Sequence, residues 1–346
     1  MDQMPVQPAC AIDRIQSDTD IWLEKELNMS KTRKAAIIGI GHVGAHVASA
    51  LATQGFVDDI LLLDQDEDKV ISEVQDLNDA MLWMPHTVRI HGGDFEDLKD
   101  VDVIINCVGN ISTLQVKNDR TLELRFNLEA VDSYASQIVQ SGFDGVIINI
   151  SNPCDVITRH LAMKTGLPKG RVFGTGTGLD SSRLISAISK KTGLNLKSID
   201  ACMMGEHGNL QFAPASVFSF RGAPLESVVP DLELDWKQLE KEAIDGGWVT
   251  FSRKHCTEYG IAATAARMTQ AVLEDEQIVL PASAPLEGEY GVRGLFAGVP
   301  CVIGANGAEQ VIELPLTEDE LDRMQMCCTG IAKNIEKAAE IEAGLA

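Results

Sequence analysis

His207 is the residue of this sequence best suited to transfer a proton. It lies in the run GEHGN at residues 205–209, with a glycine close on either side. An imidazole can gain and lose a proton near neutrality because its unperturbed pKa lies close to pH 7. A lone histidine is more often structural, so the assignment depends on the residues that accompany it.

Asp180 and Arg183 supply the groups that a proton-transferring histidine needs beside it. They are three residues apart in the run LDSSR at residues 179–183, a spacing that places both on one face of a helix. The carboxylate can orient an imidazole, and the guanidinium can bind a substrate carboxylate through two parallel hydrogen bonds. These residues predict chemistry on a carboxylate-bearing substrate.

Reduction of a 2-oxo acid by hydride transfer also needs a group that polarises the carbonyl. Arg120, in a predicted loop after the fourth strand, is the candidate for that role. Asn152, in the run SNP, follows the fifth predicted strand at the edge where open α/β sheets bind ligands.

A glycine-rich motif predicts a dinucleotide site. Residues 37–44 read IIGIGHVG, which places Gly39, Gly41 and Gly44 directly after a strand and before an amphipathic helix. The first glycine permits a tight turn, the second lets the backbone approach a pyrophosphate, and the third lets helix and strand pack closely. The helix N-terminus presents N–H groups to the phosphate charge.

Asp64 indicates which dinucleotide is bound. It ends the second predicted strand, 20 residues after Gly44, where a carboxylate accepts hydrogen bonds from both ribose hydroxyls. The carboxylate would repel a 2′-phosphate, and residues 65–68 contain no arginine or lysine. NAD rather than NADP is therefore the predicted cofactor.

The elements that position these residues form an α/β pattern. Short apolar runs at 35–38, 60–63, 88–90, 103–105 and 146–148 alternate with helical patterns. Strands this uniformly apolar are buried on both faces, as in a parallel sheet covered by helices. Residues 33–173 are therefore predicted to form an NAD-binding Rossmann domain with a doubly wound parallel sheet.

The second half of the chain predicts an α+β substrate-binding catalytic domain over residues 174–346. Its expected elements are a helix at 180–193, strands near 199–204 and 214–221, a long helix at 250–273, a hairpin-rich stretch at 278–313 and a helix from Thr317.

Residues 1–31 form an N-terminal extension that we expect to be flexible. The alternatives are an arm that clasps another copy of the chain, or an upstream start with Met29 as the true start.

Composition narrows the range of partners. The 346 residues carry a formal net charge of −22, which opposes nucleic-acid binding and offers no basic face to anionic lipid. Eight cysteines include no CxxC pair, and we find neither a signal peptide nor an apolar run of about 18 residues. A cytoplasmic protein with reduced thiols is expected, without metal, nucleic-acid or membrane partners.

Taken together, the motifs resemble those of the lactate/malate dehydrogenase family from residue 34 to about residue 340, most of all its L-2-hydroxyisocaproate dehydrogenase branch. Besides the motifs above, the resemblance rests on DLN at 76–78, Asp119-Arg120 with Asn127 seven residues later, SNPCD at 151–155, GTGT at 174–177 and TEYGIA at 257–262.

The resemblance implies an NAD-dependent L-2-hydroxyacid dehydrogenase that assembles as a homodimer or homotetramer. In it His207 and Asp180 form the proton-relay pair, Arg183 binds the substrate carboxylate, and Arg120 polarises the carbonyl from a closing loop. Asn152 and Thr257 line the substrate. Further cofactor contacts are implied for Val43, Lys69, Gly109, Asn110, Asn127, Ile150 and Asn152.

The substrate depends on the residue six positions before Arg120, which in the family reads the substrate side chain. Leu114 occupies that position, and an aliphatic side chain cannot pair with a second carboxylate, so malate is disfavoured. A medium apolar 2-oxo acid such as 2-oxoisocaproate or phenylpyruvate is expected. The loop is longer than in lactate enzymes, and if Gln115 takes the position instead, the substrate is pyruvate.

Three further interpretations follow from particular residues. Ile185 and Asp200 stand where sugar-bisphosphate-activated lactate enzymes carry cations, so no such activation is expected. Cys327 and Cys328 would suit a redox-sensing, non-catalytic NAD-binding protein, which the intact catalytic set argues against. A Rossmann-fold transferase or epimerase would not need Asp180 and Arg183.

Overall fold

The computed structural model describes residues 32–110 and 120–344. The N-terminal extension, Leu114 and Gln115 lie outside these residues, and of Arg120 only the main chain is described. In the described part of the chain, no helix has the length and apolar character required to cross a bilayer.

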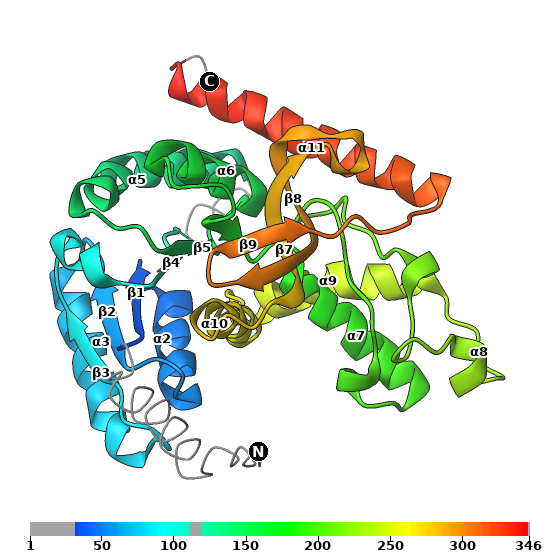
Figure 1. The fold of residues 1–346 in the computed structure, drawn as a ribbon, viewed down its shortest axis with the longest axis horizontal. Helices are drawn as coiled ribbons and strands as arrows, with labels where there is room; N and C mark the ends of the chain where they lie inside the picture. The colour runs from blue at the N-terminus through cyan, green and yellow to red at the C-terminus, as the bar shows by residue number, and fades with distance from the viewer. Residues whose placement is uncertain (1–31, 111–119, 345–346) are drawn as a thin grey trace, which may run out of the picture. The chain divides into compact units, whose positions relative to one another are not determined.

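One sheet of nine strands, in the order β3-β2-β1-β4-β5-β6-β7-β8-β9, organises the described residues (Figure 1). The first six strands are parallel, as predicted for the Rossmann half. The strand order reverses between β1 and β4, so their carboxyl ends frame the crevice where such sheets bind ligands. These strands are β1 (Lys34–Ile38), β2 (Asp59–Leu63), β3 (Arg89–Gly92), β4 (Val103–Asn106), β5 (Val146–Asn149) and β6 (Val172–Gly174).

Helices cover both faces of the parallel strands because alternate apolar residues point to opposite faces. Ile37 and Ile105 belong to one core, and Ile104 and Ile147 to the other. The first core is covered by α2 (His42–Gln54), α3 (Glu67–Ala80) and α10 (Tyr259–Leu273); the second by α5 (Arg120–Ser141) and α6 (Cys154–Thr165).

The sheet continues into the second half of the chain as an antiparallel meander of three strands. It is formed by β7 (Ile278–Glu287), β8 (Arg293–Gly304) and β9 (Gly307–Val311), which confirms the predicted hairpin-rich stretch. β7 pairs antiparallel with β6 at Gly174 and Ser283. Residues far apart in sequence are thereby fixed on neighbouring strands.

A third core lies between α7 (Gly178–Thr192) and α9 (Trp236–Lys254), where Leu184, Ile188, Leu239 and Ala243 are buried. The short helix α8 (Leu225–Val228) lies between them in sequence. The helix predicted at residues 180–193 is confirmed as α7.

The prediction of strands near residues 199–204 and 214–221 is wrong. The structure has only isolated bridges there, between Asp200 and Ser219 and between Met204 and Phe212. Pro214 has no N–H to donate, and a 3-10 turn at Ala215–Val217 follows it, so the ladder cannot extend.

The single long helix predicted at 250–273 is also wrong. α9 ends at Lys254 and α10 begins at Tyr259. His255 adopts a left-handed conformation, with φ of 65°, and its N–H caps α9 by donating to Phe251 O. Residues 250–259 contain no proline or glycine, so no helix-breaking residue marks the turn in the sequence.

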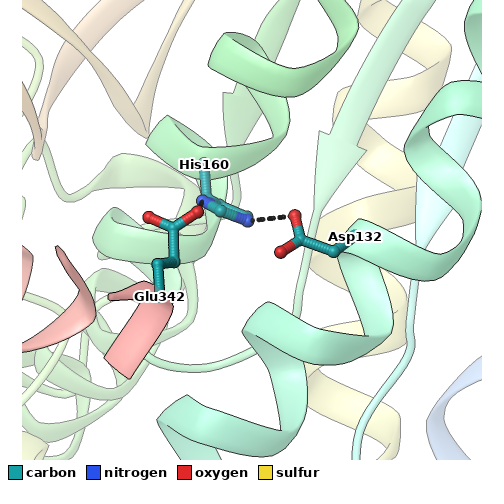
Figure 2. Close-up of side chains that lie close together, drawn as sticks. All are labelled: Asp132, His160 and Glu342. Carbon is teal, nitrogen blue, oxygen red and sulfur yellow. Dashed lines mark hydrogen bonds and ion pairs between the residues drawn. The ribbon is translucent and has the colours of Figure 1, made fainter. Parts of the chain in front are cut away.

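The C-terminal helix α11 (Glu318–Glu342) begins with a capping box in which Thr317 and Glu320 satisfy each other's backbone N–H groups. Its far end meets α5 and α6, where Glu342, Asp132 and His160 lie together (Figure 2). Lys164 Nζ lies 2.9 Å from Asp132 Oδ1 and 3.0 Å from Glu342 Oε1. Its ammonium neutralises both carboxylates, and their hydrogen bonds raise the pKa of Lys164.

We expect Lys164→Met to lower the free energy of unfolding by about 1 kcal/mol, since the network is partly exposed and its two carboxylates would lose their shared cation. Urea denaturation at low salt measures this change. Lys333→Met, at an exposed lysine of α11 with no ion pair among residues 32–110 and 120–344, is the matched control. Equal unfolding midpoints for the two variants would contradict the expectation.

Candidate active site

His207 and Asp180 form a hydrogen-bonded pair at the centre of the site. Asp180 lies in the first turn of α7 with its side chain 1% exposed, and its Oδ2 is 2.6 Å from His207 Nδ1. The imidazole itself is 27% exposed. Since Nδ1–H donates its hydrogen bond to the carboxylate, Nε2 is the atom left to exchange a proton with a ligand.

Charge in this pair favours the imidazolium form. Burial alone would lower the pKa of His207, but the Asp180 charge and hydrogen bond outweigh it and raise this pKa above its ordinary 6.5. Burial likewise opposes ionisation of Asp180, yet His207 and Arg183 hold the pKa of its carboxyl below the usual value. The geometry is that of a general acid–base pair.

Arg183 binds the other oxygen of the same carboxylate, with Nη1 2.8 Å from Asp180 Oδ1. Its side chain packs on Gly246 and Gly247 of α9, where an added Cβ would lie 3.1 Å from Arg183 Cδ and 3.4 Å from Nη1, respectively. Two glycines inside a helix cost about 1 kcal/mol each relative to alanine. The Arg183 side chain therefore occupies the space that a side chain at either position would take.

Asn152 follows β5 at the carboxyl edge of the sheet, and Asn127 Nδ2 donates to its main-chain oxygen at 2.6 Å. The Asn152–Pro153 peptide is cis. Asn127 therefore supports Asn152 from α5, in addition to the cofactor contact that the sequence suggested for it.

A buried polar network beneath this edge was missed by sequence reasoning. Asn106, the last residue of β4, donates to Asn149 Oδ1 at 2.8 Å and to Ser151 Oγ at 3.0 Å, and it accepts from Tyr134 Oη at 2.8 Å. The sequence indicated this network only by the asparagine that ends each of two otherwise apolar strands. The network fixes the loops that follow β4 and β5.

The glycine-rich loop has the shape a pyrophosphate site needs. Gly39 has φ of +90°, and an added Cβ would lie 2.8 Å from the Val108 backbone; at Gly44 it would lie 2.1 Å from Gly39 O. At Gly41 an added Cβ would meet nothing within 4 Å, so the space in front of the α2 N-terminus is open. This cradle fits a dinucleotide.

Asp64 follows β2 and is tied to the same loop. Its Oδ2 accepts the Ile40 N–H at 2.7 Å and its Oδ1 accepts the Asp66 N–H at 3.1 Å. The remaining lone pairs of the carboxylate suit the hydroxyls of an adenosine ribose.

The other residues assigned to the cofactor follow the ends of parallel strands or begin the next helix. Val43 lies in the first turn of α2 and Lys69 in that of α3, while Gly109 and Asn110 follow β4 and Ile150 follows β5. The topology therefore brings all of them to one edge of the sheet.

Two predicted substrate residues lie at helix starts. Thr257 lies in the turn before α10, and α10 packs on α2, which begins at the glycine-rich loop. The sequence predicted Arg120 in a loop, but the main chain of Arg120 begins helix α5. A helix start is hard to place from sequence, since its first turn has no intrahelical donor bonds to satisfy.

Two family models match the chain. The lactate/malate dehydrogenase NAD binding domain matches residues 33–174, and the lactate/malate dehydrogenase alpha/beta C-terminal domain matches residues 177–342. The L-lactate dehydrogenase of Fusobacterium nucleatum subsp. nucleatum is 39% identical over 314 residues, covering 89% of this chain and 98% of that protein. L-lactate dehydrogenase 1 of Bifidobacterium longum is 36% identical over 292 residues, or 83% and 92%.

Solved structures agree with these matches. A lactate dehydrogenase from a deep-sea metagenome library has a TM-score of 0.85 and 29% identity, covering 89% of this chain and 99% of that one. The ligand-bound minor L-lactate dehydrogenase of Enterococcus mundtii has a TM-score of 0.85 and 32% identity, covering 89% and 98%.

A doubly wound NAD-binding half joined through one sheet to an α/β half with a histidine–aspartate pair defines a dinucleotide-dependent oxidoreductase. The chain belongs to the lactate/malate dehydrogenase family. It is an NAD-dependent 2-hydroxyacid oxidoreductase, which confirms the class, fold and cofactor expected from the sequence.

We expect Asp180→Asn to lower kcat/KM for oxo-acid reduction at least about 100-fold. The substitution removes the charge that orients the His207 ring and stabilises its imidazolium form. With His207 as the expected proton donor, reduction would need the imidazolium, so activity should fall as pH rises through the raised pKa of His207, and this fall should move to lower pH in the variant. NADH-linked rates across pH measure both effects. An unchanged alkaline limb would contradict the expectation.

We expect Gly246→Ala to raise KM for the oxo acid about tenfold, because the new methyl group must displace the Arg183 side chain that it would crowd. The free energy of unfolding should change by less than about 1 kcal/mol, since alanine favours the helix. Steady-state kinetics and urea denaturation separate the two. The control is Gly166→Ala, at the left-handed glycine that caps α6, with φ of +65° and open space around it; it should lower stability but leave KM unchanged.

Proposed function

We propose that this enzyme interconverts pyruvate and L-lactate with NADH and NAD. The observation that supports the chemistry is that one buried carboxylate, that of Asp180, binds both His207 and Arg183. The proposal for the substrate rests on the relatives, whose names are L-lactate dehydrogenases. They favour the Gln115 alternative over the expectation of 2-oxoisocaproate or phenylpyruvate.

Each residue then has one task in the reduction. Arg183 binds the substrate carboxylate, and Arg120 polarises the carbonyl. The glycine-rich loop and Asp64 would hold NADH, which when bound would supply the hydride for the carbonyl carbon. His207 Nε2 donates its proton to the carbonyl oxygen, which becomes the hydroxyl, and the charge of Asp180 stabilises the imidazolium before the transfer.

NADH oxidation against pyruvate, 2-oxoisocaproate, phenylpyruvate and oxaloacetate, compared by kcat/KM, tests the substrate. We expect pyruvate to exceed the branched and aromatic acids by about tenfold or more, since a glutamine in the specificity position favours a small methyl substrate. Gln115→Met should then lower the preference for pyruvate, and Leu114→Met, the matched control, should not. A preference for 2-oxoisocaproate or phenylpyruvate over pyruvate would contradict the proposal and favour the expectation based on Leu114.

We further propose that the enzyme is a homo-oligomer. Leu82 and Trp83 of the 3-10 helix η1 (Met81–Trp83) are 79% and 86% exposed, and Ile71 of the preceding α3 is 67% exposed. Exposed large apolar side chains close together in the chain suit burial against another protein surface. A cytoplasmic location remains a prediction.

The redox-sensor alternative loses its chemical basis. Cys327 and Cys328 are buried, and burial raises the pKa of Cys327 to about 11 and that of Cys328 to about 12. Reactive cysteines need an accessible thiolate. We therefore assign this pair to the packing of α11.

A further inference from the structure

Asp155 is a buried carboxylate beside His207 to which the roles above assign no function. It is the second residue of α6 and is 3% exposed. Its Oδ2 accepts the His207 N–H at 3.0 Å, and its Oδ1 accepts the Ser283 hydroxyl at 2.6 Å. Burying a charge is costly, so a carboxylate kept in such a place needs a reason.

His207 is held by carboxylates at two different points. Asp180, from α7, binds the ring at Nδ1, and Asp155, from α6, binds the main-chain nitrogen. The first bond fixes the rotation of the imidazole, and the second fixes the point of the backbone from which the side chain departs. Both must be set for Nε2 to keep a constant direction.

The anchor of Asp155 is itself part of the sheet. Ser283 lies on β7 opposite Gly174 of β6, and the neighbouring strand β8 pairs with the histidine loop through Gly298 and Gly205. The Ser283 hydroxyl thus joins α6 to the strands on which the loop rests. Asp155 closes this connection by binding the loop directly.

We propose that Asp155 is a positioning residue for proton transfer: its carboxylate fixes the His207 main chain and its negative charge favours the imidazolium. The proposal rests on the proposed role of His207. Asp155 acts through that residue rather than by touching the substrate.

The electrostatics agree with this geometry. Burial raises the pKa of Asp155 to about 6, against the opposing effects of the Ser283 hydroxyl and of the His207 N–H and charge. Its ionised form in turn contributes to the raised pKa of His207. The titratable and charged groups around it are His207 and Glu206 of the loop, Cys154 of α6, and Cys327 and Cys328 of α11.

Asp155→Asn and Asp155→Ala separate the two contributions. The asparagine can still accept the His207 N–H but has no charge, so the alkaline limb of kcat/KM for oxo-acid reduction should move about 0.5 to 1 pH unit lower, with kcat at low pH retained. The alanine also loses the bond, so kcat should fall about tenfold or more at every pH while KM changes little.

Histidine NMR of the protein without substrate gives a readout that does not depend on turnover. The pKa of the His207 ring should fall in Asp155→Asn. The matched control is Glu320→Gln, since Glu320 is also a buried carboxylate that accepts a backbone N–H and a serine hydroxyl, both from Ser216. That variant should change stability without moving the His207 titration or the pH profile.

The outcomes are distinct. A folded Asp155→Asn with an unchanged His207 titration and pH profile, or an Asp155→Ala with wild-type kcat, overturns the role of Asp155. Full activity in His207→Gln instead overturns the proposed role of His207. Any oxo acid that the wild-type enzyme reduces serves for these assays, so the choice of substrate does not affect the result.

Discussion

The site depends on how the charge of Asp180 is shared. A carboxylate with 1% exposure is stable in ionised form only when its lone pairs are satisfied by cations or strong donors. His207 takes one oxygen and Arg183 the other, at 2.6 and 2.8 Å. The proposed proton donor and the proposed carboxylate-binding group are thus fixed relative to each other through one residue, and a change in one partner alters the environment of the other.

The nine-stranded sheet makes this arrangement possible. α7 begins shortly after β6, and β7 returns beside β6, so the start of α7 and the anchoring residue Ser283 are placed by neighbouring strands. On the other side, the network of Asn106, Asn149 and Ser151 fixes the loops that follow β4 and β5. The loops that follow β4 and β5 and the histidine loop are therefore set by strands of one sheet.

Sequence reasoning succeeded where a local pattern determines structure. Apolar strands and the glycine-rich turn predicted the parallel sheet and the NAD site, because burial on both faces and the close approach at Gly39 and Gly44 restrict the allowed residues. It failed where contacts between distant parts of the chain determine the structure. The role proposed for Asp155 depends on its bond to Ser283, which β7 brings to it across the fold, and no local pattern records that pairing. The position of Arg120 at the start of α5 was likewise invisible locally.

The break between α9 and α10 shows why such non-local contacts matter for function. The turn at His255 places Glu258, which is 7% exposed, against the start of α2. There its Oε1 lies 3.4 Å from His42 Nδ1. Lys254 pairs with the same carboxylate and lowers the pKa of Glu258, so the buried charge is compensated within the turn. Since Thr257 is adjacent, the turn links the N-terminus of α2, where the pyrophosphate is expected, to a proposed substrate contact. The uninterrupted helix predicted over residues 250–273 would separate these two groups.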